Sequence, residues 1–534
     1  MFWADELAGR LSGAQVVNDS KTPSGTIHVG SLRGPVIADV ITRALRAHGL
    51  PTTLLYGVDD LDPMDAQALL TPDAIERLMG VPLAKVPDPL QDGHSSYARH
   101  FAEAFIGTFS GLGIHPDRYY WMSEIYASGE MDRYIRLALD RAALVRELYE
   151  RVANVRHPAE WHPLAVICEH CGRIGTTIVT RWDGEQVAYE CRTDLVRWAT
   201  GCGRSGRVSP FGGRAKLPFN VDWAAKWSLF GVTIEPCGKD LATAGGARDR
   251  ADAVAQEVFE RNPPLRVDYE FLNISGRKMS TSRGHGAAAN EIAEVVPAEQ
   301  LRLLFVRPRP NHAIDFDPVG TDAIPRLFDE SDRIAAASAG REVRGELPSD
   351  HERVFAAALP DPDSDVRGEG AAYRVPFNHL ALLLQVPGVD LAARVEAEKG
   401  GPLTEHETAL LAERMRAALA WLEAYAPDRA HLEVRRDGLP PSARELDHEQ
   451  RGLLAAVAAA LAAGAAWDGE SLQAAIFDAA KQVGLPAGRA FAAIYAAFLG
   501  QASGPRAGWL LAALEPEFVI ERLRAAAAPD TLPA

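Results

Sequence analysis

The N-terminal part of the chain alternates short apolar runs with one long helical pattern. Residues 15–19 read as a β-strand, and Leu32–His48 carries apolar side chains at intervals of three and four residues, which predicts a helix. Gly49 and Pro51 end this helix, and the apolar run Thr52–Tyr56 predicts a second strand. A strand, a glycine-containing loop, a helix and a strand open a doubly wound α/β nucleotide-binding fold, in which the ligand lies at the carboxyl ends of the strands.

Helical patterns dominate the remainder of the chain. Tyr97–Leu112 and Arg133–Val155 predict helices, and Tyr269–Ile274 predicts another strand. From about Pro325 onward the strand patterns stop, and long segments rich in alanine and leucine follow. The clearest of these segments are Glu405–Ala426, Gln450–Ala465, Ser471–Val483, Ala487–Leu499 and Pro516–Ala527. An α/β part followed by an all-α domain is therefore expected.

The composition is that of an ordinary globular protein. Hydrophobic residues make up 47% of the chain and charged residues 24%. With 534 residues the chain is too long for a single hydrophobic core, so several domains are expected. No apolar run has the length of a membrane span, and the acidic N-terminus lacks a signal pattern, so we expect a cytoplasmic protein without a membrane partner. The net charge of −16 argues mildly against nucleic-acid binding, although an acidic enzyme can still carry one basic groove.

Four of the five cysteines fall between positions 168 and 202, which points to a metal site instead of a disulfide framework. Cys168 and Cys171 have the two-residue spacing of half a zinc knuckle. The second half is irregular, because ten residues separate Cys191 from Cys202. These four cysteines could hold a structural Zn²⁺ if residues 192–201 loop out. The alternative is a degenerate finger with free thiols.

Two polar loops suit the binding of a polyphosphate. The first, Thr22–Ser31, reads T-P-S-G-T-I-H-V-G-S and precedes the first predicted helix, whose N-terminal N–H groups and dipole favour phosphate. The second, Gly276–Gly284, reads G-R-K-M-S-T-S-R-G about 250 residues later, and its cationic and hydroxylated side chains suit the same ligand. Taken alone, each loop could be a solvated turn without a role.

Together these loops resemble the HIGH-type and KMSKS-type signatures of class I aminoacyl-tRNA synthetases. His28-Val29-Gly30-Ser31 stands for the first signature and Lys278–Ser282 for the second. Further stretches resemble the class I lysyl-tRNA synthetases in particular. Asp59, Asp60 and Asp62 match the acids of a W-D-D-Y-D pattern, and Val221–Gly246 is similar to V-D-W-P-x-R-W followed by F-E-P-x-G-K-D-H-x-x-x-G-G. Read from the residues alone, the three carboxylates could face a substrate amino group, hold Mg²⁺ or cap the next helix.

The resemblance covers nearly the whole chain and implies a domain order. It implies a Rossmann-type doubly wound catalytic domain in two halves, a zinc-ribbon-like insertion between them and an all-α helical-cage anticodon-binding domain. The expected bounds are 1–155 for the first half, 156–215 for the insertion, 216–325 for the second half with the KMSKS-type loop, and 326–534 for the helical domain.

The implied activity is the ATP-dependent attachment of L-lysine to its tRNA through a lysyl-adenylate, by a monomer that uses ATP, Mg²⁺ and a structural Zn²⁺. Carried over by motif, the catalytic residues are His28, Gly30, Lys278, Ser280 and Ser282. The ATP-binding residues are Ser24, Gly25, His28, Ser31, Gly238, Asp240, Lys278, Met279 and Arg283. The amino-acid-binding residues are Asp59, Asp60, Phe219, Leu241 and Tyr269, and the metal ligands are Cys168, Cys171, Cys191 and Cys202.

The chain departs from the family pattern where the amino acid would bind. The pattern G-N-x-R-E ends in the glutamate expected to face lysine, and this chain has Gly34 there. Phe219 replaces a tryptophan, Leu241 replaces a histidine, and Thr281 replaces the second lysine of K-M-S-K-S. Asp39, Asp59 or Asp60 could supply the missing charge. The alternatives are a paralogue that activates another amino acid or uses another acceptor, and a catalytically weak tRNA-binding protein. A small nucleotidyltransferase would leave the helical domain unexplained.

Overall fold

The structure is a computed structural model that describes residues 1–65, 71–274, 277–278, 288–386, 390–464 and 466–528. The chain divides into two compact units. The first comprises residues 1–293, 298–316 and 346–364, and the second comprises residues 294–297, 317–345 and 365–534. This division does not follow the four domain bounds expected from the sequence, which stay a prediction.

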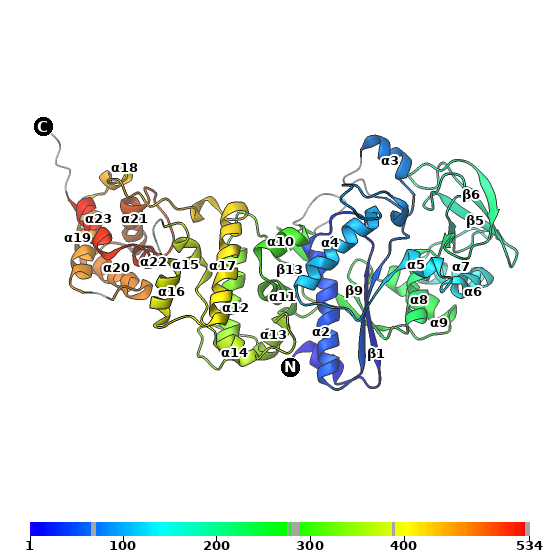
Figure 1. Cartoon of the computed structure of the whole chain (residues 1–534), viewed down its shortest axis with the longest axis horizontal. Helices are drawn as coiled ribbons and strands as arrows, with labels where there is room; N and C mark the ends of the chain where they lie inside the picture. The colour runs from blue at the N-terminus through cyan, green and yellow to red at the C-terminus, as the bar shows by residue number, and fades with distance from the viewer. Residues whose placement is uncertain (66–70, 275–276, 279–287, 387–389, 465, 529–534) are drawn as a thin grey trace. The chain divides into compact units, whose positions relative to one another are not determined.

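A five-stranded parallel sheet forms the centre of the first unit, in the order β10-β9-β1-β2-β3 (Figure 1). The strands are β1 (Gln15–Lys21), β2 (Thr52–Val58), β3 (Arg118–Trp121), β9 (Ile234–Gly238) and β10 (Leu265–Tyr269). In register, Val17 lies opposite Leu54 of β2 on one side and Ile234 of β9 on the other. The chain therefore runs outward from β1 in both directions, and the predicted doubly wound α/β fold is confirmed.

Helices cover both faces of this sheet. Helix α2 (Arg33–Ala47) packs on β1, β2 and β9, and α8 (Phe219–Phe230) and α9 (Ala247–Glu257) build the core on the opposite face. Because side chains alternate along a strand, Asp19 faces α2 whereas Asn18 reaches Glu235 on the side of α8. The other helices of this unit are α1 (Trp3–Ala8), α3 (Pro72–Leu78), α4 (Tyr97–Gly111), α5 (Met122–Ala127), α6 (Asp132–Asp140), α7 (Ala142–Ala153), α11 (Ala298–Val306) and α13 (His351–Ala358), with 3₁₀ turns η1 (Val29–Leu32) and η2 (Leu83–Lys85).

Two predicted elements are broken in the structure. The helix expected over residues 133–155 is two helices, because Arg141 leaves helical geometry and its guanidinium donates to the Val258 carbonyl at the end of α9 (2.7 Å). The strand expected over residues 269–274 is also two elements. Tyr269 ends β10, and β11 (Leu272–Ile274) belongs to a separate small sheet with β12 (Arg277–Lys278) and β13 (Ile314–Asp315).

An antiparallel insertion carries the cysteines. Its strands are β5 (Thr177–Trp182), β6 (Val187–Cys191) and β7 (Ser205–Val208). A two-stranded pair, β4 (Ala165–Val166) and β8 (Ala215–Lys216), joins the insertion to the rest of the unit. The ends of the inserted segment therefore lie side by side.

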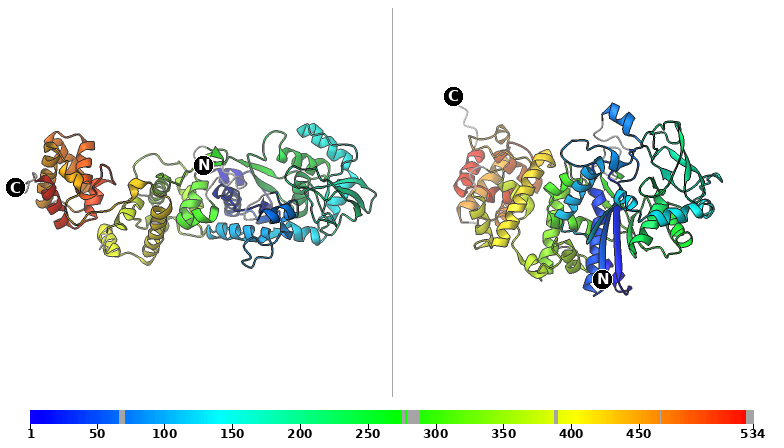
Figure 2. Two further views of the ribbon diagram at one scale, coloured as in Figure 1. Left: turned by 90° about the horizontal axis from the view of Figure 1, so that it is seen from above. Right: turned by 45° about the vertical axis from the view of Figure 1, so that its right-hand side comes forward.

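The second unit is helical. After β13, no strand occurs in the described part of the chain. Its helices are α12 (Ala323–Ser338), α14 (Val366–Ala371), α15 (Phe377–Leu383), α16 (Leu391–Lys399), α17 (Glu405–Ala424), α18 (Pro441–Arg444), α19 (His448–Ala462), α20 (Gly469–Val483), α21 (Ala487–Phe498), α22 (Ala507–Ala512) and α23 (Pro516–Ala527), with the short turn η4 (Asp428–Ala430); α10 (Ala289–Val295) begins in the first unit and ends in the second. Leucine and alanine side chains of α19 to α23 form one core, and Figure 2 shows these orange and red helices as one bundle. The five helical segments predicted here are confirmed to within three residues at each end. Among the described residues, none of the helices has the length and apolar character that crossing a bilayer requires.

Candidate functional site

The first polar loop lies at the carboxyl end of β1, where the sheet order reverses. Gly25 takes a positive φ of 149°, which favours glycine, and the Tyr97 hydroxyl donates to the Ser24 carbonyl (3.2 Å). His28 is the N-cap of the turn η1, whose Gly30 and Ser31 lead directly into α2. The Ser31 N–H donates to the His28 carbonyl (2.9 Å). His28 therefore lies beside a helix N-terminus at the ligand-binding edge of the sheet.

Backbone contacts join this loop to the chain on the far side of the second polar loop. His28 pairs with Ala288 in an antiparallel bridge, and the Ala289 N–H donates to the Ile27 carbonyl (2.9 Å). On the near side, Lys278 of β12 pairs with Asn273 of β11. The predicted residues Met279, Ser280, Ser282 and Arg283 lie outside the described residues, as does Thr281. The backbone thus holds the first signature segment against the chain that follows the second polar loop, although about 260 positions separate His28 from Ala288.

Arg33, the residue after η1, fastens α2 to the same region. Its buried guanidinium donates to the carbonyls of Glu270 (2.7 Å), Pro310 (3.1 Å) and His312 (2.8 Å). These carbonyls flank β11 and β13, the strands that carry β12. One side chain therefore links the first loop to the support of the second.

The acidic run after β2 is largely engaged by other side chains. Asp59 forms a buried ion pair with Lys226 (2.6 Å), and Asp62 pairs with Lys216 (2.6 Å) and accepts from the Thr22 hydroxyl of the first loop (2.7 Å). Although burial acts to raise the pKa of Asp59, the two ammonium groups outweigh it and lower that pKa.

Asp60 binds the N-terminal turn of α5, which is not the helix that follows it in the chain. Its carboxylate accepts from the Ser123 N–H (2.8 Å) and the Ser123 hydroxyl (2.5 Å), and burial raises its pKa to about 6. The sequence suggested capping of the next helix, α3, but Thr71 caps that helix. Asp59 forms an ion pair that the sequence did not indicate. The predicted contact of Asp59 and Asp60 with the amino acid stays a prediction.

Three further predicted residues meet at the carboxyl ends of β9 and β10. Tyr269 lies opposite Gly238 in register, and a Cβ on Gly238 would lie 2.9 Å from Asp240 Oδ1 and 3.6 Å from the Tyr269 ring. Leu241 follows in a turn, and its own N–H donates to the Gly238 carbonyl (2.9 Å). Phe219 lies at the start of α8, with its ring packed on Trp223 at a centroid distance of 5.3 Å. Gly238, Asp240 and Tyr269 therefore form one cluster beside the first loop's strand, and Phe219 lies on a different helix.

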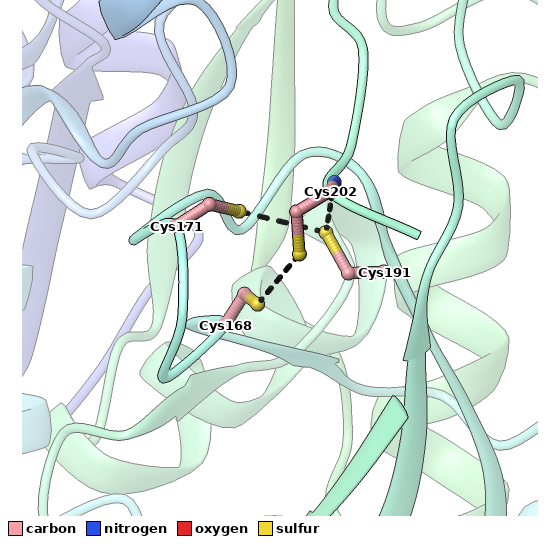
Figure 3. A group of neighbouring side chains, drawn as sticks. All are labelled: Cys168, Cys171, Cys191 and Cys202. Atoms are coloured by element: carbon pink, nitrogen blue, oxygen red, sulfur yellow. Dashed lines mark hydrogen bonds between the residues drawn. The ribbon is translucent and has the colours of Figure 1, made fainter. Parts of the chain in front are cut away.

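The four cysteines of the insertion converge on one point (Figure 3). Their Sγ atoms all lie within 4.8 Å of one another, with Cys168 and Cys202 at 3.7 Å and Cys171 and Cys191 at 3.6 Å. A tetrahedral Zn²⁺ with four thiolates at its usual bond length separates the sulfurs by about 3.8 Å. Burial raises the pKa of the Cys168 thiol, and raises that of Cys191 to about 12. The geometry therefore fits Zn²⁺, and the burial means that four thiolates here need a cation.

The irregular spacing of the second cysteine pair has a structural explanation. Residues 192–201 leave the knuckle and return to it, because the Gly201 N–H donates to the Arg192 carbonyl (3.1 Å) and closes the excursion. The excursion buries Ala199 in an apolar cluster with residues from Met64 to Phe101 and lays the Trp198 ring against Gly175. The ten residues therefore anchor the insertion to the rest of the unit and leave the ligand geometry intact.

Sequence reasoning did not identify three residues of this region. Lys216 and Lys226 neutralise the acidic run, and Asp19 lies at the end of β1 facing α2. Asp19 had a signal in the sequence, because its position in the strand places it on the same face as Val17. The pairing of Asp59 with Lys226, 167 residues apart, had none.

Comparisons with known proteins give a consistent assignment. The family model for tRNA synthetases class I (K) matches residues 1–359, and a model for an anticodon binding domain matches residues 430–527. A lysine–tRNA ligase of Archaeoglobus fulgidus is 34% identical over 533 residues, covering 98% of this chain and 100% of that one. Lysine–tRNA ligases of Methanosarcina barkeri and Thermoplasma volcanium are 32% and 30% identical, with at least 98% of each chain covered.

The similarity thus extends over both units, and the first signature segment pairs with the chain that follows the second polar loop. The chain belongs to the family of class I lysyl-type tRNA synthetases.

Proposed function

We propose that this protein is a lysine–tRNA ligase that attaches L-lysine to tRNA through a lysyl-adenylate. A lysine carboxylate oxygen attacks the α-phosphorus of ATP, the bond from that phosphorus to the bridging oxygen breaks, and pyrophosphate leaves. A hydroxyl of the tRNA then attacks the lysyl carbonyl, and AMP leaves. The observation that carries this proposal is the backbone pairing of His28 with Ala288, which joins the first signature segment to the chain that follows the second polar loop.

Such a phosphoryl transfer needs alignment and charge stabilisation more than covalent help from the protein. We assign stabilisation of the α-phosphoryl charge to His28, Gly30 and the N-terminus of α2. Ser24, Gly25, Ser31, Gly238 and Asp240 surround ATP in this assignment. Lys278, Met279 and Arg283 serve the pyrophosphate end, and Ser280 and Ser282 shape the second loop. Mg²⁺ would be held mainly by the phosphates.

The remaining assignments concern the partners. We propose that the helical second unit binds the anticodon of tRNA, as the anticodon-domain match over residues 430–527 supports. Zn²⁺ on the four cysteines is assigned a structural role, and the protein is proposed to act as a monomer in the cytoplasm, where its tRNA substrate is charged.

One observation favours a second candidate. Gly34, Phe219 and Leu241 depart from the lysyl pattern at three places expected to contact the amino acid. A paralogue that activates a different amino acid would keep the same sheet, loops and ATP chemistry. Lysine remains the leading assignment because the full-length relatives named above are lysine–tRNA ligases.

Amino-acid-dependent ATP–pyrophosphate exchange tests this proposal. The purified protein is assayed with each of the twenty amino acids, with and without total tRNA, and charging of tRNA is measured in parallel. Exchange and charging with lysine are expected, and His28→Ala should lower the exchange rate by about 100-fold or more because it removes one charge-stabilising donor. Exchange with another amino acid would replace lysine by the second candidate. If no amino acid supports exchange, even when tRNA is present, the result would contradict a ligase.

A further inference from the structure

The carboxylate of Asp19 occupies the space next to Gly34 in which the side chain of residue 34 would begin. A Cβ built on Gly34 would lie 2.8 Å from Asp19 Oδ2 and 3.1 Å from Asp19 Oδ1. Gly34 holds the position of the glutamate that the family pattern places opposite lysine. A carboxylate is therefore still present at this place, but it comes from β1 instead of α2.

The other acidic side chains near this edge already have partners. Asp39 pairs with Arg43 (2.8 Å) and Arg302 (2.6 Å), and Asp59 pairs with Lys226. Asp60 accepts two hydrogen bonds from Ser123. The three acids that the sequence offered as substitutes for the missing glutamate are thus engaged within the protein.

The carboxylate of Glu235 is also engaged, in the core on the far side of the sheet. It accepts from the indole N–H groups of Trp223 (2.7 Å) and Trp227 (2.8 Å) and from the amide of Asn18. In contrast, Asp19 forms no ion pair within 4 Å with any cation of the described residues. Its side chain is partly exposed, so a ligand can reach it.

The surroundings of Asp19 suit an organic cation. It lies at the carboxyl end of β1, the strand at which the sheet order reverses and beside which a ligand crevice is expected. Tyr56 lies opposite Asp19 in register on β2. Burial first, and then the negative charge of Asp19, raise the pKa of Tyr56 and of Tyr269. A carboxylate beside an aromatic ring is the kind of site that binds an ammonium group.

Burial, followed by the charge of Glu235, raises the pKa of Asp19 to about 7. Keeping this carboxylate ionised is therefore costly in the unliganded protein. A cationic ligand would offset that cost by pairing with it.

We propose that Asp19 binds the side-chain ammonium of the lysine substrate, and that the Asp19–Gly34 pair replaces the glutamate of the family pattern. This inference rests on the proposed function, because it assigns the amino-acid specificity of the same site. Gly34 is required in this arrangement, since any larger residue would displace the Asp19 carboxylate from the position next to α2.

Steady-state ATP–pyrophosphate exchange with Asp19→Asn tests the inference. Asparagine has nearly the same size but no charge, so the variant should raise the KM for lysine by about 100-fold or more while the KM for ATP changes less than threefold. Asp268→Asn serves as the matched control, because Asp268 is a half-exposed acid on β10 next to Tyr269 and pairs with Arg266. This control should leave both KM values unchanged.

A second pair of variants tests directly whether a carboxylate on β1 replaces one on α2. Gly34→Glu alone should be impaired, because the new Cβ collides with the Asp19 carboxylate and adds a second negative charge. Asp19→Ala with Gly34→Glu should recover lysine-dependent exchange to within about tenfold of the original protein, since it returns the carboxylate to α2. Thermal melts of all variants separate loss of binding from loss of folding.

Each outcome has a distinct meaning. A KM for lysine that is unchanged in Asp19→Asn, or a KM for ATP that rises by the same factor, would overturn the assignment of Asp19 and leave the lysine ligase standing. An original protein that activates another amino acid but not lysine would overturn the proposed function and this assignment together. A selective rise in the KM for lysine, with rescue by the double variant, would establish both.

Discussion

Lys226 and Asp59 form an ion pair that is buried at the carboxyl edge of the sheet, with Nζ 2.6 Å from Oδ1. Asp222, one turn earlier on α8, lies 3.7 Å from the same ammonium. Lys226 thus faces two buried carboxylates. Although burial acts to lower the pKa of Lys226, the charges of Asp59 and Asp222 outweigh it and raise that pKa, so the ammonium stays protonated.

We predict that Lys226→Met destabilises the first unit by about 3–5 kcal/mol, because it removes the ion-pair partner of the buried Asp59 and leaves Asp222 with Lys216 alone, 3.8 Å away. Lys226→Arg is the control, since the family pattern V-D-W-P-x-R-W has arginine at this position and the charge is kept. Chemical denaturation followed by tryptophan fluorescence measures both variants. Equal stability of Lys226→Met and the original protein would show that this pair contributes little.

Arg33→Met is predicted to loosen the support of the second loop. The substitution removes the guanidinium that donates to the carbonyls of Glu270, Pro310 and His312, at about 0.5–1.5 kcal/mol for each hydrogen bond lost. Hydrogen exchange should accelerate in residues 271–274 and 313–316. Arg46→Met, on the same helix, removes an exposed ion pair with Asp117 and should change stability by less than about 0.5 kcal/mol. Unchanged hydrogen exchange in Arg33→Met would rule out this supporting role of Arg33.

Metal content provides a prediction for the insertion. The purified protein should contain about one Zn²⁺ per chain, and Cys171→Ser should lose it, because three thiolates bind the ion far less tightly than four. Cys237→Ser should keep the metal, since Cys237 is buried in β9 away from the cluster. Elemental analysis after dialysis measures both. Metal-free protein of full stability and activity would identify the cluster as four free thiols.

The raised pKa of Asp19 predicts an unusual pH dependence. The pKa is about 7 in the folded chain against about 3.9 in an unfolded one, so ionisation of Asp19 opposes folding. Burial is the largest cause of this raised pKa, and the charges of Glu235 and Asp59 add to it, whereas the backbone of Ser20 and the charge of Lys21 lower it. This destabilisation of the folded state is complete above pH 7 and disappears as the pH falls toward 4.

Asp19→Asn should therefore melt higher than the original protein at pH 8, by about 2–4 °C for each 1 kcal/mol relieved. The difference should shrink through pH 6 and vanish near pH 4. Scanning calorimetry of the unliganded proteins at several pH values measures it. A variant that melts lower at pH 8 would mean that the Asp19 carboxylate stabilises the N-terminus of α2.

Local sequence patterns predicted much of the architecture, because they depend on neighbours along the chain. The strand, loop and helix around His28 follow from periodicity and glycine placement, and the alanine-rich helices of the second unit agree closely with their predicted bounds. The break at Arg141 was not predictable, because it depends on a contact with Val258, 117 residues away. A helical pattern alone does not reveal which residue will leave the helix to meet a distant carbonyl.

The site was less predictable than the fold for the same reason. The sequence does not show which of Asp39, Asp59 and Asp60 is free to bind a ligand. In the structure each is bound by a residue from a distant segment, namely Arg302, Lys226 and Ser123 respectively. Asp19 becomes a candidate only when α2 places Gly34 against it. Tertiary pairing decides which charge remains available for a ligand.

The strand order of the sheet has a consequence for how the protein is made. One edge of β1 can pair with β2 soon after both strands are synthesised. The other edge pairs with β9, which begins 217 residues after Val17. At about 5–20 residues per second, a ribosome needs roughly 10–45 s to deliver that partner. During this interval the nascent chain presents the open edge of a central strand, and the exposed edge is a template for pairing with other chains. The interior position of β1 in the sheet therefore implies that its second edge stays unpaired until β9 emerges.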